Sequence, residues 1–396
     1  MKVPLRTLFF RGVELVPGNQ LRLLQSGAEF FPALIAAIDA AHSEIHLETY
    51  IFNVDPSVEA VRDGLIRAAR RGVRVCLLID GVGSRELPTA WLDALKTAGV
   101  SMLLYRPLVG RGWRSNPRNL RRLHRKLAVI DARIALVGGM NLIDDFEPVR
   151  FDAPRLDFSV EVQGPLLANI HQSVRRLRRL VALTQLQPGE RSAPPIRPSW
   201  PTDGRMRAAF VVRDNFAHRR DIERAYLAAL ALAHDEIILA NAYFLPGYRF
   251  RKLLKNAAMR GVRVHLLVQG HTDHPFFQAA ARALYRDLLT AGVVIHEYQA
   301  SELHAKVAVV DRHWATVGSS NIDPFSLLLA REANIVVDDA AFAGDLRQRL
   351  RHAIGQSVLL DAADWQRRPW PHRMLSWLAY GGVRLMVGLS GVGRWV

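Results

Sequence analysis

The chain has 396 residues, of which 49% are apolar and 23% are charged. This composition is typical of a globular protein, with enough apolar material for two domains of ordinary size, and it excludes wholesale disorder. The net charge of +16 points to an anionic partner, either a nucleic acid or an acidic membrane surface.

The apolar pattern and the cysteine content argue against several classes of protein. Residues 1–10 contain too few apolar side chains for a signal peptide, and no run of about 18 uncharged apolar residues predicts a membrane span. The single cysteine, Cys76, lies in an apolar run and is expected to be a buried structural thiol. An intrachain disulfide and a cysteine zinc cluster are therefore excluded.

An internal repeat organises the chain. Each half begins with an alanine-rich helical segment and an apolar strand, and a second helix then ends at a glycine, Gly72 or Gly261, just before the next strand. The matched segments are 44–52 with 236–244, 68–75 with 257–264, 97–100 with 290–293, and 123–126 with 303–306.

The alternation of strands and helices predicts an α/β fold built from two similar sandwich domains. We expect the first domain over residues 1–186 and the second over 207–365. A linker rich in proline and polar residues separates them at 187–206, and an apolar and basic tail follows at 366–396.

One chemical pattern occurs in both halves, as His-x-Lys-x4-Asp followed by a glycine-containing turn and an asparagine. The first copy consists of His124, Lys126, Asp131 and Asn141, and the second of His304, Lys306, Asp311 and Asn321.

The spacing of this pattern gives it chemical meaning. Residues i and i+2 of a strand face the same way, so each histidine projects beside a lysine. Imidazole can act as a nucleophile or transfer a proton, and an ammonium group stabilises the non-bridging oxygens of a phosphodiester. Asn141 and Asn321 can add neutral hydrogen bonds to the same oxygens. A single pair would carry little weight, but two copies in register within a repeat predict a catalytic site.

The doubled motif resembles that of the phospholipase D superfamily. Further segments are similar to the bacterial cardiolipin synthases, in particular those of type B: residues 18–32, 212–215, 240–248 and 313–321. The resemblance runs from about residue 10 to 365. It implies two phospholipase D-type α/β sandwich domains whose motifs meet in one active site at their interface.

The resemblance also implies a mechanism without a metal or other cofactor. One histidine forms a phosphohistidine, and the other protonates the leaving alcohol and activates the incoming one. We expect His124 to be the nucleophile and His304 the acid and base, with Lys126 and Lys306 on the phosphate. In this family an acid downstream of each motif binds a histidine, which makes Asp157 and Glu332 the candidates. Asp131 and Asp311, though part of the motif, are better suited to anchoring the turn than to touching substrate.

The implied reaction is phosphatidyl transfer from phosphatidylglycerol, or from phosphatidylethanolamine, to phosphatidylglycerol. A hydrolytic phospholipase D would share every catalytic residue, and a nuclease or other phosphodiesterase of the superfamily would fit the basic charge. No nucleic-acid-binding module is evident, so no nucleic acid partner is expected, and the oligomeric state is not predicted.

Two basic clusters and the C-terminal segment favour contact with an anionic phospholipid membrane. Residues 111–126 include seven basic side chains and Trp113 but no acid, and residues 175–179 include four arginines. Residues 377–389 are apolar, with arginines at intervals around them, as in an interfacial helix. The competing interpretations are phosphate binding on DNA for the basic loop and a subunit contact for the tail. We expect a peripheral protein on the cytoplasmic face of a bacterial inner membrane.

Overall fold

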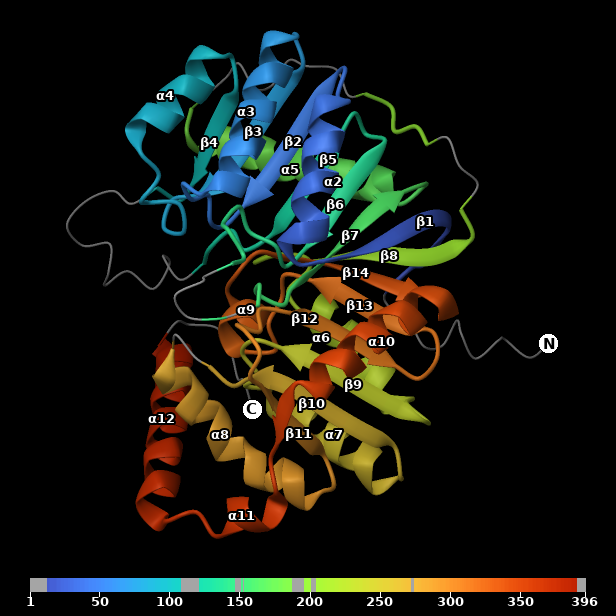
Figure 1. Cartoon of the computed structure of the whole chain (residues 1–396), viewed down its shortest axis with the longest axis vertical. Coiled ribbons are helices and arrows are strands. Elements are labelled where there is room, and N and C mark those ends of the chain that lie inside the picture. Colours follow the sequence, from blue (N-terminus) through green and yellow to red (C-terminus); the bar gives the residue numbers. More distant parts are fainter. Residues whose placement is uncertain are drawn as a thin grey trace.

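The computed structural model describes residues 13–107, 121–146, 151, 153–186, 196–200, 204–271 and 274–389. Within these residues fifteen strands form one mixed sheet in the order β15-β11-β10-β9-β12-β13-β14-β8-β1-β7-β6-β5-β2-β3-β4. Reading outward from the centre, β1-β7-β6-β5-β2-β3-β4 of the first half corresponds strand for strand to β8-β14-β13-β12-β9-β10-β11 of the second. The internal repeat is therefore a structural repeat (Figure 1).

The elements of the first half are, in chain order, β1 (Val16–Gln25), α2 (Ser26–Asp39), β2 (Glu44–Thr49), α3 (Pro56–Arg70), β3 (Arg74–Asp80), α4 (Thr89–Thr97), β4 (Ser101–Tyr105), β5 (Lys126–Ile130), β6 (Ile134–Gly138), β7 (Phe158–Gln163) and α5 (Leu167–Thr184).

The second half continues with β8 (Met206–Arg213), α6 (Asp221–Ala231), β9 (Glu236–Asn241), α7 (Tyr248–Met259), β10 (Arg263–Gln269), α8 (Pro275–Thr290), β11 (Val294–Tyr298), β12 (Lys306–Val310), β13 (Trp314–Gly318), α9 (Pro324–Leu328), β14 (Glu332–Asp338), α10 (Ala340–Gly355), β15 (Ser357–Leu359), α11 (Ala362–Gln366) and α12 (Trp370–Leu389).

Local sequence explains the βαβ units. Helix α3 begins at Pro56, whose fixed φ suits a first helical turn, and it buries an apolar face at helical spacing: Val58, Val61, Leu65 and Ala68. The chain then passes through Gly72, whose φ of +88° favours glycine and lets the chain turn back into β3. Gly261, with a φ of +90°, does the same before β10. Both glycines end helices where the sequence predicted.

The two halves are joined through the sheet and through a shared core. At the centre β1 pairs antiparallel with β8, and β6 and β7 pack against β13 and β14. One apolar cluster takes side chains from both halves, among them Val129 and Val160 from the first and Val309 and Ile335 from the second. This shared core fixes the two motifs relative to each other.

The predicted linker and basic clusters are only partly described. Of the predicted linker, 196–200 contains neither helix nor strand, 187–195 and 201–203 lie outside the described residues, and β8 begins at Met206. The basic loop lies outside them at 108–120. Residues 175–179 are helical, within α5, but Arg178 is buried and donates to the backbone carbonyls of Leu77 and Ser101, so it does not belong to an exposed patch.

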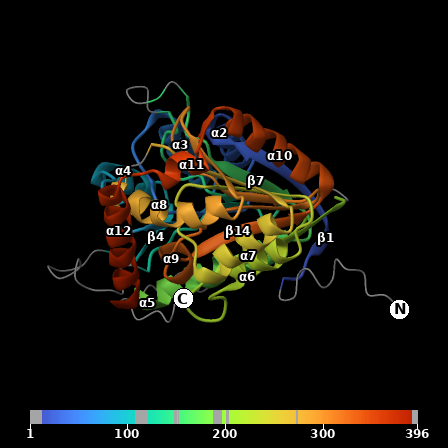
Figure 2. The same ribbon diagram turned by 90° about the horizontal axis from the view of Figure 1, so that it is seen from below.

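The predicted C-terminal helix is present as α12, which packs along α8 (Figures 1 and 2). Its buried face consists of Ala379, Tyr380, Val383 and Val387. Much of the remaining surface of α12 is apolar and exposed. In the part of the chain that the structure describes, no helix is both long enough and apolar enough to cross a membrane.

Candidate active site

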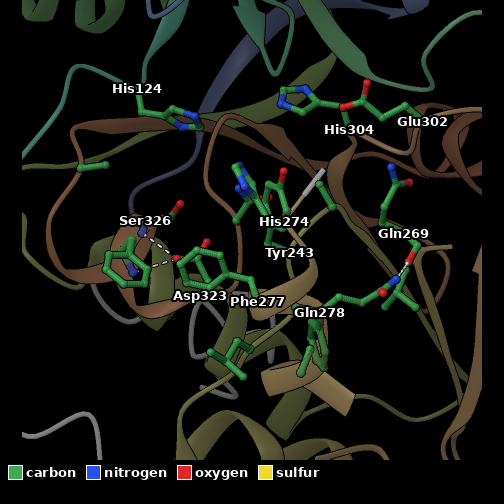
Figure 3. A pocket seen from close by; sticks show the side chains of 18 of the residues that line it. His124, Tyr243, Gln269, His274, Phe277, Gln278, Glu302, His304, Asp323 and Ser326 are labelled. Carbon is green, nitrogen blue, oxygen red and sulfur yellow. Dashed lines mark hydrogen bonds between the residues drawn. The ribbon is translucent and has the colours of Figure 1, made fainter. Parts of the chain in front are cut away.

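A pocket of about 540 Å³ lies between the two halves and brings both histidines together (Figure 3). His124 and Asn141 line it from the first half, and His304 and Asn321 from the second. Ser326, five residues after Asn321, also lies in its wall. Four predicted site residues that are far apart in the sequence therefore share one cavity.

The chain segments entering the motif strands cross from one half to the other. The backbone N–H of His124 donates to the carbonyl of Arg331, and that of His304 donates to the carbonyl of Leu156, both at 2.9 Å. Each histidine is therefore held at the start of β14 or β7 of the opposite half. The two predicted acids lie there: Glu332 is the first residue of β14, and Asp157 immediately precedes β7.

The result is a crossed pair of histidine–acid contacts. His124 Nδ1 lies 2.9 Å from Glu332 Oε1 and 3.1 Å from Oε2. His304 Nδ1 lies 2.5 Å from Asp157 Oδ2. Both acids are buried, at 0% and 1% exposure, so each has little contact with water. A carboxylate on Nδ1 fixes the tautomer and leaves Nε2 of each ring for chemistry.

The two motif lysines lie beneath the histidines in the protein interior. Lys126 Nζ donates to the backbone carbonyl of His124 at 2.8 Å, and Lys306 Nζ donates to that of His304. Lys306 Nζ also lies 4.0 Å from Asp157 Oδ2. These ammonium groups therefore lie close enough to the histidines to stabilise negative charge that develops there.

Burial and neighbouring charges shift the pKa values in this pocket. Burial, reinforced by the positive charge of Lys306, holds the pKa of His304 well below its usual value. Burial also lowers the pKa of His124, against the opposing effect of Glu332. The same desolvation raises the pKa of Asp157 to about 6 and lowers that of Lys306 to about 8. Both imidazoles are thus held neutral in the free pocket.

Asp131 and Asp311 lie at the far ends of their strands and do not reach the pocket. Both adopt a φ of +51°, in the left-handed region that aspartate tolerates. Asp131 accepts hydrogen bonds from the backbone N–H groups of His42, Ser43 and Glu44. Asp311 accepts from those of His234, Asp235 and Glu236. Each aspartate ties its hairpin turn to the start of β2 or β9.

Sequence reasoning missed the apolar wall of the pocket, which comes mostly from the second half. Helix α8 contributes Phe277, Gln278 and Tyr285, and the end of β9 leads to Tyr243 and Phe244. Tyr243 lies in residues 240–248, which are similar to the cardiolipin synthases, and this similarity could have identified it as a site residue. Helix α8 carries no motif, and only the tertiary structure shows that it lines the site. Its aromatic side chains give the pocket an apolar side.

Comparisons with known proteins identify the family to which the chain belongs. The model of the family described as "Cardiolipin synthase, PLD-like domain" matches residues 34–145 and 226–354, one segment in each half. The chain is 41% identical over 390 residues to cardiolipin synthase B of Salmonella typhimurium, covering 94% of this chain and 90% of that one. It is 39% identical to cardiolipin synthase B of Escherichia coli over 94% and 90% of the two chains. The chain belongs to the phospholipase D-like cardiolipin synthase family.

Two solved structures share the fold at low identity. Phosphatidylserine synthase of Haemophilus influenzae superposes with a TM-score of 0.70 at 14% identity, over 98% of this chain and 99% of the other. Polyphosphate kinase of Porphyromonas gingivalis gives 0.56 at 15% identity, over 94% and 53%. The α/β fold predicted from the repeat and the two phospholipase D-like halves implied by the resemblance are both confirmed.

Proposed function

We propose that this protein synthesises cardiolipin by transferring a phosphatidyl group to phosphatidylglycerol, with phosphatidylglycerol or phosphatidylethanolamine as the donor. The observation that carries the proposal is the crossed pair of histidine–acid contacts on one pocket. The names of the relatives and the apolar wall of the pocket support a lipid substrate.

In the first step, Nε2 of His124 attacks the phosphorus of the donor lipid. The bond from phosphorus to the headgroup oxygen breaks, and Nε2 of His304 gives its proton to that oxygen, which leaves as glycerol or ethanolamine. Lys126 and Lys306 stabilise the charge on the non-bridging oxygens, and Asn141 and Asn321 donate neutral hydrogen bonds to them. The phosphatidyl group is then held on His124.

In the second step, His304 removes a proton from a glycerol hydroxyl of phosphatidylglycerol. The resulting oxygen attacks phosphorus, the phosphorus–nitrogen bond breaks, and cardiolipin leaves with His124 neutral again. Glu332 and Asp157 keep the rings oriented through both steps and stabilise each imidazole when it carries positive charge.

Binding of the substrate favours the protonated histidine that the first step needs. Burial lowers the pKa of both histidines, so both are neutral when the pocket is empty. A bound phosphodiester adds one negative charge and raises the pKa of both imidazoles. One histidine then takes up a proton from solvent, so substrate binding itself should generate the general acid.

The test is product analysis with purified protein and phosphatidylglycerol vesicles, in the presence of a chelator. Cardiolipin and glycerol in equal amounts are expected from the wild type, and neither from His304→Ala. Acid-quenched protein should carry the phosphatidyl group on the peptide containing His124. Phosphatidic acid as the main product would show a hydrolase. Inert lipid together with cleavage of single-stranded DNA would show a nuclease, and a label on His304 would reverse the two roles.

We propose further that α12 docks the pocket on an anionic phospholipid surface, which for this protein would be the cytoplasmic leaflet of a bacterial inner membrane. Its solvent-facing side exposes Trp370 (70%), Leu375 (60%), Trp377 (55%), Leu378 (63%) and Leu385 (65%). Arg373 and Arg384 are also exposed on this helix. Tryptophan and arginine around an apolar face are characteristic of interfacial helices, and the net charge of +16 favours an acidic leaflet.

The position of α12 links docking to catalysis. The helix packs on α8, and α8 lines the pocket. Replacing Trp377 and Leu378 by serine should reduce co-sedimentation with phosphatidylglycerol vesicles at least about tenfold, since each large apolar side chain contributes roughly 1.5 to 3 kcal/mol on burial. Met259→Ser, at a 73% exposed apolar side chain on α7, is the matched control and should leave binding unchanged. Equal binding by all three proteins would contradict docking through α12.

A further inference from the structure

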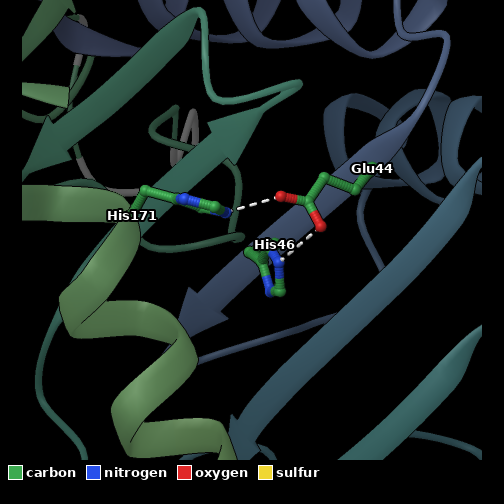
Figure 4. A group of neighbouring side chains, drawn as sticks. All are labelled: Glu44, His46 and His171. Carbon is green, nitrogen blue, oxygen red and sulfur yellow. Dashed lines mark hydrogen bonds and ion pairs between the residues drawn. The ribbon is translucent and has the colours of Figure 1, made fainter. Parts of the chain in front are cut away.

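We propose that Glu44, His46 and His171 form a binding site for a divalent transition-metal ion of the zinc type. These buried side chains lie together in the first half (Figure 4), and none of them lines the pocket. In the part of the chain that the structure describes, they bring one ligand atom each to within 4.8 Å of the others. The site belongs to no step of the proposed reaction and stands independently of it.

The secondary structure brings the three ligands together. Glu44 and His46 are two residues apart on β2 and face the same side of the sheet, which α5 covers with His171. His171 Nε2 lies 2.5 Å from Glu44 Oε1, and His46 Nε2 lies 3.3 Å from Oε2. The exposed fractions of the three residues are 0%, 6% and 4% for Glu44, His46 and His171. A metal here would cross-link α5 to β2.

Two imidazoles and a carboxylate are a donor set that zinc prefers. Burial lowers the pKa of His46, against the opposing effect of Glu44. Burial alone would raise the pKa of Glu44, but its interactions with His171, His46 and Arg74 hold it far below its usual value. His46 Nε2 is buried, and it lies 3.3 Å from Glu44 Oε2 without the geometry of a hydrogen bond, so this nitrogen can turn to a metal ion.

The second half shows that the fold does not require this arrangement. Glu236 occupies the place of Glu44: it starts β9, and the turn aspartate binds its backbone as Asp131 binds that of Glu44. Arg347 Nε and Arg351 Nη2, both on α10, lie 3.2 Å and 3.0 Å from its carboxylate. Ile238 stands two residues after it, where the first half has His46. Arginine neutralises a carboxylate but cannot bind a metal, whereas the first half supplies two histidines that can.

Nearby guanidinium groups set a limit on the affinity. Arg74 contacts Glu44 Oε2, the charge of Arg178 acts on His46, and Arg175 interacts electrostatically with Glu44. Coordination through Oε1 and the two Nε2 atoms leaves Oε2 to Arg74, in the way that metal-bound carboxylates are commonly hydrogen-bonded from outside. The positive charge still opposes a dication, so we expect moderate affinity. Tyr50, which lines the pocket, follows the end of β2, four residues after His46. A strand rises about 3.3 Å per residue, so the ion would stabilise the fold without touching substrate.

The experiment uses the full chain without a histidine tag, stripped with a chelator and dialysed. Zn²⁺ is titrated by calorimetry, Co²⁺ by its ligand-field absorption, and the melting temperature is followed in both. The wild type should bind one equivalent and melt at a higher temperature with zinc. The double variant His46→Ile with His171→Arg copies the second half at these positions, so it should fold, bind no metal and show no shift.

Controls separate this site from the other histidines. His265 Nδ1 lies 3.1 Å from His296 Nε2 in a stacked pair that has no carboxylate ligand, so His265→Leu should still bind one equivalent. His304→Ala alters the pocket and should also bind one. If the wild type shows no saturable one-to-one binding, or if the double variant binds as the wild type does, the proposal fails. Transferase activity of the stripped protein is measured beside it, and its presence or absence bears on the proposed function alone.

Discussion

The two histidine–acid pairs perform the same task with different parts. Asp157 lies 2.5 Å from His304, and the longer Glu332 lies 2.9 Å from His124 and also accepts a hydrogen bond from Ser319. The first half has Gly139 where the second has Ser319, and a Cβ at Gly139 would lie 2.2 Å from Asp157 Oδ1. A short acid beside glycine and a long acid beside serine fill equivalent spaces. The repeat therefore conserves the contact with each histidine, while the supporting side chains are free to differ.

Removing either histidine should abolish catalytic activity, because both halves contribute to one site. His124→Ala removes the nucleophile and His304→Ala the proton donor, and the two act as one unit. Each should lower kcat by at least about 10⁴-fold, and the double variant should be hardly worse than either alone. The measurement is cardiolipin formation under single-turnover conditions. Substantial turnover by one single variant would rule out a shared two-histidine site.

Replacing each acid by its amide compares how much the two histidine–acid pairs contribute to kcat. Asp157→Asn should lower kcat by about 10³-fold to 10⁴-fold, because an amide cannot stabilise the imidazolium of His304. Glu332→Gln should lose less, because Ser319 can still hydrogen-bond the amide and hold it against His124. Equal losses in both variants would show that Ser319 contributes nothing to this difference.

The pH profile distinguishes the pairs further. The pKa of Asp157 is raised to about 6, so below that pH the carboxylate takes up a proton and no longer stabilises a charged His304. Activity of the wild type should therefore fall as the pH drops through about 6. Glu332→Gln should keep this acid limb and Asp157→Asn should lose it. An unchanged limb in Asp157→Asn would assign it to another group.

Gly139 and Ser319 occupy equivalent places in the two halves. Exchanging their residue types should impair the His304–Asp157 pair strongly and the His124–Glu332 pair only slightly. In Gly139→Ser the new Cβ meets the carboxylate of Asp157, so His304 loses its partner and activity should fall at least about 100-fold. Ser319→Gly removes one hydrogen bond to Glu332 and should cost about tenfold or less. Both variants are compared by kcat, with far-ultraviolet circular dichroism to verify folding. A harmless Gly139→Ser would show that the close approach is not needed.

The turn aspartates provide the smallest expected effect on chemistry. Asp131→Asn and Asp311→Asn each weaken a carboxylate that binds backbone N–H groups, which should lower the free energy of unfolding by about 1 to 3 kcal/mol. Activity at low temperature should change less than about threefold, because neither side chain reaches the pocket. Chemical denaturation measures the first and initial rates the second. A large loss of kcat without a loss of stability would show that these aspartates take part in catalysis.

The sequence by itself determined much of this protein. The repeat, the α/β pattern and the doubled motif can be recognised from local sequence. The spacing of apolar residues and glycines such as Gly72 and Gly261 indicate the helices and strands, and the two-residue spacing places each histidine beside its lysine. Asp157 and Glu332 could be named in advance because they occupy equivalent places downstream of the two motifs, where the family resemblance implies an acid that binds a histidine.

Only the tertiary structure decided which acid serves which histidine. The pairing is crossed because His124 hydrogen-bonds to Arg331 and His304 to Leu156, contacts between segments more than 140 residues apart that no local pattern encodes. The same holds for the aromatic wall from α8 and for His171, whose helix reaches Glu44 only through packing. Short-range spacing fixes what a strand or helix presents, whereas the partner of a buried side chain depends on how the whole sheet closes.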